Sequence, residues 1–238
     1  MGSEGTSIYL AEVSLQRRIF IFTPEKPVTW ASGYQMPVYN DNRVYLGNYF
    51  NRSHIAAAFE SLLADKKEPD IVAGTATAGI PHATSLADKL HLPLIYLRDK
   101  PKNHGLKNRI EGLKADTSLE GKEVLLIEDL VSTGGSSVNA VAAIREAGGT
   151  VNSCFSIFNY GFLGAEEVFA GKKPYDAQGN RLSTPCQLYS LLTFDTLFRA
   201  AIKGKYISTE QQREIEEWRA DPFNWGDKHG FPRVVKKV

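Results

Sequence analysis

The segment VLLIEDLVSTGGSS, residues 124–137, decides the expected fold of this chain. Its four leading apolar residues, 124–127, predict a buried strand, and the small polar residues that follow predict a loop leading into a helix over 136–147. Two carboxylates, Glu128 and Asp129, come directly after the predicted strand. Open α/β sheets bind ligands at the carboxyl ends of their strands, so this junction is the expected binding site.

The same junction combines two kinds of group that suit a sugar phosphate. Each carboxylate can accept hydrogen bonds from a ribose diol. Residues 132–136, Ser-Thr-Gly-Gly-Ser, offer backbone N–H groups, hydroxyls and a helix N-terminus to a phosphate, and we call them the phosphate loop. A plain strand–loop–helix connection with a serine cap is the alternative, but the acidic pair favours a binding site. A P-loop is excluded because no Gly-Lys-Ser/Thr follows.

Strands and helices are expected to alternate on either side of this segment. Apolar runs predict strands at 70–73, 94–97 and 151–158, and helical patterns occupy 53–63 (capped by Ser53) and 81–90. Segments 187–202 and 208–219 are also predicted to be helical. This alternation predicts an α/β fold with a parallel sheet flanked by helices. We expect one domain over 1–238, with an N-terminal hood at about 1–50, an α/β core at about 51–160 and a C-terminal helical extension at about 161–238 packed on the core.

The composition and net charge argue against several classes of protein. The formal net charge of +1 provides no global basic surface for nucleic acid, and no stretch approaches the roughly 18 apolar residues that a membrane helix needs. Two cysteines, Cys154 and Cys186, are too few for a disulfide framework, which favours a reduced setting. We therefore expect a cytoplasmic protein that binds neither nucleic acid nor membrane, with Cys154, Trp218 and Trp225 in its interior.

Two further loops carry candidate binding groups. Gly-Thr-Ala-Thr-Ala-Gly, residues 74–79, also joins a strand to a helix and suits a pyrophosphate, although a tight turn of small residues fits equally well; we call it the diphosphate loop. The segment 98–112 is rich in cations and holds Arg98, Lys100, Lys102, His104, Lys107 and Arg109. These charges would repel one another unless an anion joined them, and the loop suits a lid, but a solvated basic loop remains open.

These motifs together resemble a known family of enzymes. The string at 124–137 resembles the signature of the type I phosphoribosyltransferases, and Arg-x-Lys-x-Lys-x-His-Gly at 98–105 is similar to the catalytic loop of orotate phosphoribosyltransferases. The segment 29–43 resembles the hood that closes over the base in that family, with matches at Ser32, Gly33, Pro37 and Tyr39. Met36 replaces a serine there, and Ala31 stands where one branch has a substrate-binding lysine.

The resemblance implies a type I phosphoribosyltransferase fold and the transfer of a phosphoribosyl group from phosphoribosyl pyrophosphate (PRPP) to orotate, in de novo pyrimidine biosynthesis. Catalytic roles are implied for Lys102, His104 and Asp129, and a contact with orotate for Ser132. The residues implied to bind PRPP are Arg98, Lys100, Lys102, His104, Glu128, Asp129, Leu130, Val131, Ser132, Thr133, Gly134, Gly135 and Ser136.

The resemblance also implies a Mg²⁺ ion held mainly by PRPP, and a homodimer in which the 98–112 loop is supplied by the neighbouring subunit. Two other functions stay open on the sequence. One is transfer to another nucleobase, because the arginine that contacts orotate in one branch has no clear match near 158–160. The other is a regulator that senses PRPP with this fold, although no helix-turn-helix or basic surface supports it.

Overall fold

A computed structural model describes residues 2–98, 109–114 and 117–234, and the chain divides into two units. The first unit comprises residues 1–7 and 42–195, and the second comprises 8–41 and 196–238. Helix α1 (Gly2–Gln16) begins in the first unit and ends in the second. Among the described residues, no helix is both long enough and apolar enough to cross a membrane.

The first unit is built on a six-stranded sheet in the order β10-β9-β8-β5-β6-β7. Its strands are β5 (Ile71–Thr75), β6 (Leu94–Leu97), β7 (Ile110–Glu111), β8 (Val124–Val131), β9 (Ser153–Asn159) and β10 (Gln187–Thr193). All neighbouring pairs are parallel except β6 and β7, which are antiparallel. The expected α/β fold with a mostly parallel sheet is therefore confirmed.

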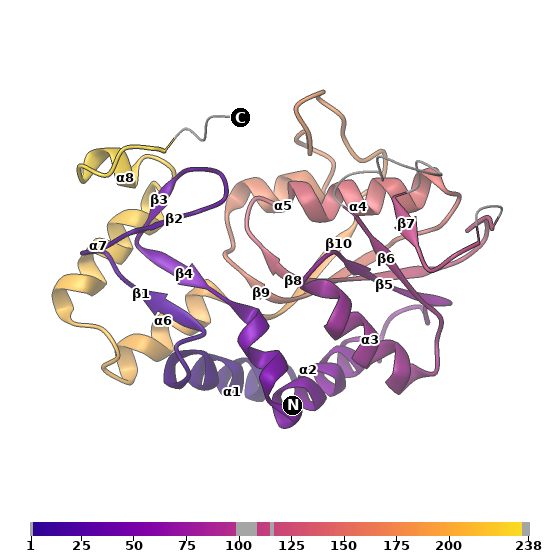
Figure 1. The fold of residues 1–238 in the computed structure, drawn as a ribbon, viewed down its shortest axis with the longest axis horizontal. Helices are drawn as coiled ribbons and strands as arrows, with labels where there is room; N and C mark the ends of the chain where they lie inside the picture. Colours follow the sequence, from indigo (N-terminus) through magenta and orange to yellow (C-terminus); the bar gives the residue numbers. More distant parts are fainter. Residues whose placement is uncertain (1, 99–108, 115–116, 235–238) are drawn as a thin grey trace. The chain divides into compact units, whose positions relative to one another are not determined.

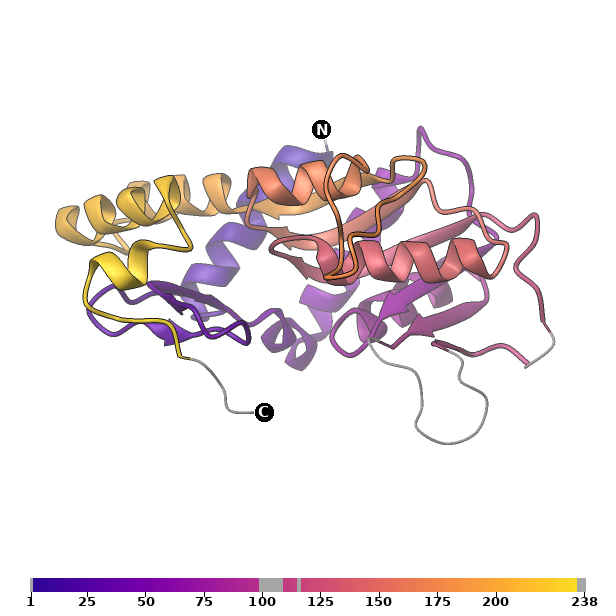
Figure 2. The same ribbon diagram turned by 90° about the horizontal axis from the view of Figure 1, so that it is seen from above.

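Helices cover both faces of this sheet (Figure 1). One face carries α2 (Tyr49–Leu62) and α3 (Gly79–Leu90), which follow the short 3-10 helix η1 (Asn42–Gly47) and contact β10, β5 and β8. The other face carries α4 (Gly135–Glu146) and α5 (Leu163–Phe169), which lie next to each other in Figure 2. Helices thus bury both faces, as is usual for a parallel sheet. The carboxyl ends of β5 and β8 lead directly into the two candidate loops.

Two elements differ from their predicted type or bounds. Residues 187–193 form the strand β10 rather than part of a helix, because a short apolar run beside an existing parallel edge can pair with β9 along its whole length. Helix α2 starts at Tyr49, and Asn48 rather than Ser53 caps it by accepting a hydrogen bond from the Asn51 amide (3.1 Å).

The second unit joins the predicted hood to the C-terminal helices. Strand β1 (Phe20–Phe22) pairs with β4 (Val38–Asn40), and β2 (Val28–Thr29) pairs with β3 (Gln35–Met36). The C-terminal part contributes α6 (Phe194–Lys203), α7 (Thr209–Ala220) and α8 (Trp225–Lys228). Residues 163–193, which the sequence assigns to the C-terminal extension, belong to the sheet unit.

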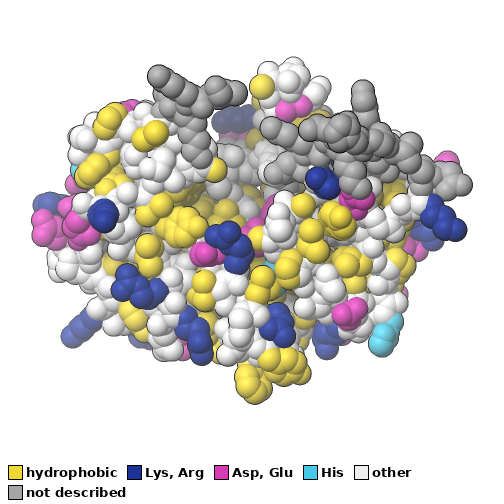
Figure 3. Space-filling view, viewed as in Figure 1, with side chains coloured by type: hydrophobic (Ala, Val, Ile, Leu, Met, Phe, Trp, Pro, Cys, Tyr) yellow, Lys and Arg dark blue, Asp and Glu magenta, His cyan; other side chains and the backbone are white. Residues whose placement is uncertain are grey.

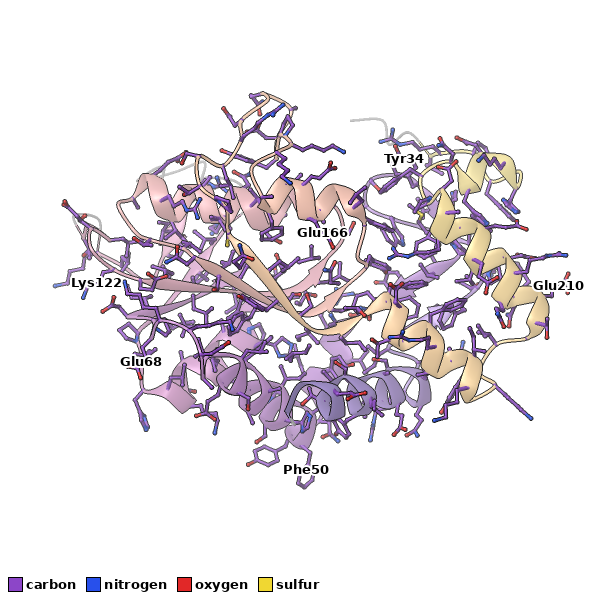
Figure 4. All side chains as sticks on the ribbon, turned by 180° about the vertical axis from the view of Figure 1, so that it is seen from behind. Tyr34, Phe50, Glu68, Lys122, Glu166 and Glu210 are labelled. Atoms are coloured by element: carbon purple, nitrogen blue, oxygen red, sulfur yellow. The ribbon has the colours of Figure 1, made fainter. Side chains whose placement is uncertain are left out.

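Side chains of the C-terminal part of the chain contact the hood directly. The indole of Trp218 donates to the sulfur of Met36 at 3.2 Å, and both residues are buried. The guanidinium of Arg233 donates to the Ser32 carbonyl (2.9 Å) and lies 4.3 Å from the ring centre of Tyr34, which Figure 4 labels. Trp218 and Trp225 are interior residues as expected, and the methionine that replaces a serine is explained by the tryptophan it contacts.

Candidate active site

The acidic pair lies inside strand β8 rather than after it. β8 continues to Val131, because Leu130 and Val131 pair with Phe158 and Asn159 of β9. The carboxyls of Glu128 and Asp129 approach each other closely enough to share a side-chain hydrogen bond. The prediction that the strand ends at Ile127 is wrong because β8 continues to pair with β9 beyond it, and the two carboxyls have different environments.

Glu128 is buried, and protein donors already contact both of its carboxylate oxygens. The Thr75 hydroxyl donates to Oε1 at 2.6 Å, the Asp129 amide donates to the same oxygen at 3.1 Å, and the Ser137 hydroxyl donates to Oε2 at 2.9 Å. Burial, reinforced by the negative charge of Asp129, raises the pKa of Glu128 from 4.5 to about 8. The hydrogen bonds from Thr75 and Ser137 offset part of that rise.

Asp129 is only partly buried and meets residues from the start of η1. The Asn42 side-chain amide donates to the Asp129 backbone carbonyl at 2.6 Å, and Asn42 itself is 3% exposed. Burial raises the pKa of Asp129, while its hydrogen bond with Glu128, nearby backbone N–H groups and the charge of Arg43 oppose that rise. Asp129 is thus the member of the pair that remains accessible to a ligand.

The phosphate loop forms the sharp turn between β8 and α4. Gly134 adopts a φ of 81° and caps the helix, a conformation that favours glycine. A Cβ on Gly135 would lie 2.9 Å from the Tyr175 carbonyl oxygen, so glycine is also needed there for close approach. Thr133 and Ser136 are exposed, and the amino end of the 12-residue helix α4 is at the same place, as the sequence predicts for an anion site.

The diphosphate loop packs tightly between the sheet and helix α3. A Cβ on Gly79 would lie 2.5 Å from the Thr75 hydroxyl and 2.7 Å from the Ile127 carbonyl oxygen, and a Cβ on Gly74 would lie 2.9 Å from the Ala83 methyl group. Ala78 precedes the helix without any side-chain cap. The small residues therefore let α3 begin directly against β5 and β8, beside the acidic pair.

Replacing Gly79 with alanine should destabilise the protein by about 2–4 kcal/mol, because the new methyl group would overlap two buried oxygens. The matched control is Gly164→Ala, since a Cβ at Gly164 meets nothing within 4 Å. Urea unfolding of both variants checks the prediction. Equal free energies of unfolding for the two variants would contradict it.

The ligand-free protein should lose stability as the pH rises from 6.5 to 8. In the unfolded chain the carboxyl of Glu128 has a pKa near 4.5, whereas in the folded protein its pKa is about 8. Between these two pH values the folded state therefore binds more protons than the unfolded state. The free energy of unfolding should then fall by up to about 1.4 kcal/mol per pH unit. Burial lowers the pKa of His82 from 6.5 to about 4, which gives the opposite slope below pH 6.5.

Urea unfolding of the wild type and of Glu128→Gln at several pH values between 6.5 and 8 checks this slope. The glutamine variant cannot ionise, so its stability should change less with pH than that of the wild type. Parallel curves for the two proteins would show that Glu128 ionises normally in the fold.

The basic segment is described only at its two ends, because residues 99–108 lie outside the described part of the chain. Arg98 and Arg109 face each other there: the Arg98 amide donates to the Arg109 carbonyl (2.9 Å), and the Arg109 Nε donates to the Arg98 carbonyl (3.2 Å). Arg109 also donates to the Asn139 side chain on α4 (2.9 Å), and Arg98 lies 3.6 Å from a Glu111 oxygen. Lys100, Lys102 and His104 stay sequence-based predictions.

The structure thus brings together the acidic pair, the diphosphate loop and the phosphate loop within the first unit. Sequence reasoning missed Asn42, Arg43 and Ser137 at this site. A signal for Ser137 was present, because it precedes Val141 and Ile144 by four and seven residues and so shares their buried helix face. Among residues 2–98, 109–114 and 117–234, no group of three or more His, Cys, Asp or Glu side chains could hold a metal ion.

Comparisons with known proteins identify the family of this chain. The phosphoribosyl transferase domain model matches residues 48–162. The chain is 41% identical over 218 residues to an orotate phosphoribosyltransferase of Listeria monocytogenes, covering 91% of this chain and 97% of the relative, and 40% identical over 215 residues to that of Bacillus subtilis, covering 90% and 92%. The solved orotate phosphoribosyltransferase of Aeropyrum pernix is similar in structure, with a TM-score of 0.64, 26% identity, and coverage of 84% of this chain and 99% of that one. The chain therefore belongs to the orotate phosphoribosyltransferase family.

Proposed function

We propose that this chain transfers the 5-phosphoribosyl group of PRPP to a ring nitrogen of orotate, releasing pyrophosphate and giving orotidine 5′-monophosphate for pyrimidine biosynthesis. The observation that carries the proposal is that Asp129, the phosphate loop and the diphosphate loop meet at the ends of the neighbouring strands β5 and β8. The similarity to an orotate phosphoribosyltransferase over 97% of that relative's length supports it. A ribose held beside Asp129 would have one anion-binding loop available for its 5-phosphate and another for its diphosphate.

The residues at the site have distinct roles in this proposal. The phosphate loop holds the 5-phosphate through backbone N–H groups and hydroxyls, and Asp129 orients the ribose hydroxyls. The reaction breaks the bond from the anomeric carbon to pyrophosphate as the orotate nitrogen bonds to that carbon, so negative charge grows on the leaving group. Lys102 and His104, with Arg98 and Lys100 beside them in sequence, supply positive charge for it. Ser132 is proposed to contact orotate.

A Mg²⁺ ion is proposed to accompany the substrate. Hard oxygens of a diphosphate and a ribose are its preferred ligands, and it commonly keeps several waters rather than a full set of protein ligands. The ion would neutralise diphosphate charge while this chain's residues hold the sugar.

A homodimer with the 98–112 loop supplied by the neighbouring subunit is also proposed. Tyr49 (67% exposed) and Phe50 (73% exposed) form an apolar pair at the start of α2. Hydrophobic side chains project at the lower edge of the space-filling view (Figure 3), and Figure 4 shows Phe50 pointing away from its helix. Exposed aromatic pairs of this kind are common where proteins associate, which supports an interface on this helix. A cytoplasmic location is proposed because both cysteines are buried and free.

The direct test follows the loss of orotate absorbance in the presence of PRPP and Mg²⁺, with adenine and uracil as control bases. Turnover with orotate alone supports the proposal. Turnover with a control base but not with orotate would reassign the acceptor. Salt-sensitive binding to nucleic acid without turnover would favour a regulator instead.

A further inference from the structure

The carboxyl end of strand β9 places an asparagine beside the phosphate loop. Asn159 is the last residue of β9, and it pairs in register with Val131, the last residue of β8. Ser132, the first residue of the phosphate loop, directly follows Val131. Asn159 therefore lies next to the point at which the chain leaves β8 and enters the loop.

The side-chain amide of Asn159 has a defined orientation. Its Oδ1 accepts a hydrogen bond from the Gly161 amide at 2.8 Å. Because a backbone N–H can only donate, the oxygen and not the nitrogen must face Gly161. Asn159 is half-buried, and its Nδ2 group has no acceptor among the residues that the structure describes. The nitrogen is thus a donor that the fold orients but does not use.

The turn that orients this amide is held in place on both sides. Gly161 adopts a φ of 67°, a conformation that favours glycine, and the Tyr160 amide donates to the Val131 carbonyl at 3.0 Å. The Tyr160 ring is buried and stacks on Phe162, with ring centres 5.5 Å apart and an angle of 8° between the planes. A side chain supported in this way suits the recognition of a ligand, because little of its freedom is left to lose.

The order of the strands indicates where the acceptor base binds. Strand β8 lies between β9 and β5, and β5 leads into the diphosphate loop. Substitution at a carbon centre aligns the attacking atom and the leaving group on opposite sides of that carbon. With the ribose at Asp129 and the diphosphate on the side of β5, the ring nitrogen of the acceptor approaches from the side of β9, where Asn159 lies.

We propose that Asn159 is a specificity-determining residue whose Nδ2 group donates a hydrogen bond to an oxygen of the acceptor base. The inference rests on the proposed transfer from PRPP to orotate and deepens it by assigning a donor on the base side of the site. A carboxylate or carbonyl oxygen is the group that complements this donor. An amino group at the same place, as in an aminopurine, would leave two donors facing each other.

Two variants of Asn159 separate a contact with the base from a purely structural role. Asn159→Asp keeps an oxygen that accepts from the Gly161 amide, but it replaces the donor with a negative charge that repels the orotate carboxylate. Asn159→Ala removes the donor and the acceptor together. We expect kcat/KM for orotate to fall about a hundredfold or more in Asn159→Asp and about tenfold in Asn159→Ala. The calorimetric affinity for PRPP should change much less in both, because other segments hold the sugar and its phosphates.

A residue that only holds the turn gives the opposite order of effects. Asn159→Asp would then be close to the wild type in kcat/KM for orotate, and Asn159→Ala would be the damaged variant, with a lower free energy of unfolding in urea. That result overturns the proposal, as does a loss of PRPP affinity as large as the loss in kcat/KM. Should Asn159→Ala fail to fold, Asn159→Asp decides alone, since near-normal kcat/KM in that variant is enough to reject the contact.

The matched control is Asn224→Ala, which removes an exposed asparagine whose amide donates to Asp221 at 2.8 Å. It should keep its turnover of orotate. The wild type separates this inference from the proposed function: a wild type that binds PRPP but does not convert orotate would refute the function and the inference with it. If the wild type converts orotate, the function stands and the Asn159 variants alone decide the inference.

Discussion

Replacing Lys102 with alanine is expected to lower kcat at least a hundredfold and to leave the free energy of unfolding nearly unchanged. Lys102 is proposed to stabilise the charge that develops on the departing pyrophosphate, and loss of one preorganised charge of this kind costs about 3–4 kcal/mol in the transition state. Its segment contains no large apolar residue from 99 to 105, so the substitution should remove little buried surface. Steady-state kinetics with orotate and PRPP, together with urea unfolding, measure both quantities.

The matched control is Lys114→Ala, an exposed lysine that follows the basic segment and has no proposed contact with substrate. It should keep most of the turnover, because a lone surface charge contributes little to stability or to a reaction elsewhere. Near-normal activity of Lys102→Ala would remove that residue from the mechanism. A comparable loss in both variants would point to a general effect of positive charge instead.

The sequence predicted those parts of the fold in which local pattern and environment agree. Apolar runs at β5, β6 and β9 and the helices α3 and α4 lie within a few residues of their expected positions, because each is a buried element bounded by turn-forming residues. The phosphate loop and the diphosphate loop follow strands as the sequence predicts. Glycine marks both loops because a Cβ there would clash with neighbouring atoms or would require a backbone conformation that other residues rarely adopt.

The features that the sequence did not predict depend on contacts between residues that are far apart in the chain. The run from Gln187 to Thr193 is compatible with a helix on its own, and only the open edge of β9 makes it a strand. Glu128 resembles a ligand-binding carboxylate in the sequence, and only the hydroxyl of Thr75, 53 residues away, reveals that it is already bonded. The contact between Met36 and Trp218 likewise joins residues 182 positions apart.

Mixing the Lys102→Ala and Asp129→Asn variants, each inactive alone, should restore about a quarter of the wild-type activity after subunits exchange in a dimer. If the basic loop acts on the neighbouring subunit's site, a mixed dimer has one site with both an intact Asp129 and an intact Lys102. Random exchange makes half of the dimers mixed, and half of the sites in those dimers active. Size-exclusion chromatography and an exchange assay with tagged subunits verify that mixing occurred.

The control for this experiment mixes Lys102→Ala with a variant of the same loop, His104→Ala. Both changes then lie on one segment, so each mixed dimer carries a damaged loop at each site, and no recovery is expected whichever subunit supplies it. Recovery only in the mixture with Asp129→Asn therefore identifies a loop supplied in trans. Without recovery after verified exchange, the loop must serve the subunit that carries it, and the apolar pair on α2 would have to be explained by another interface.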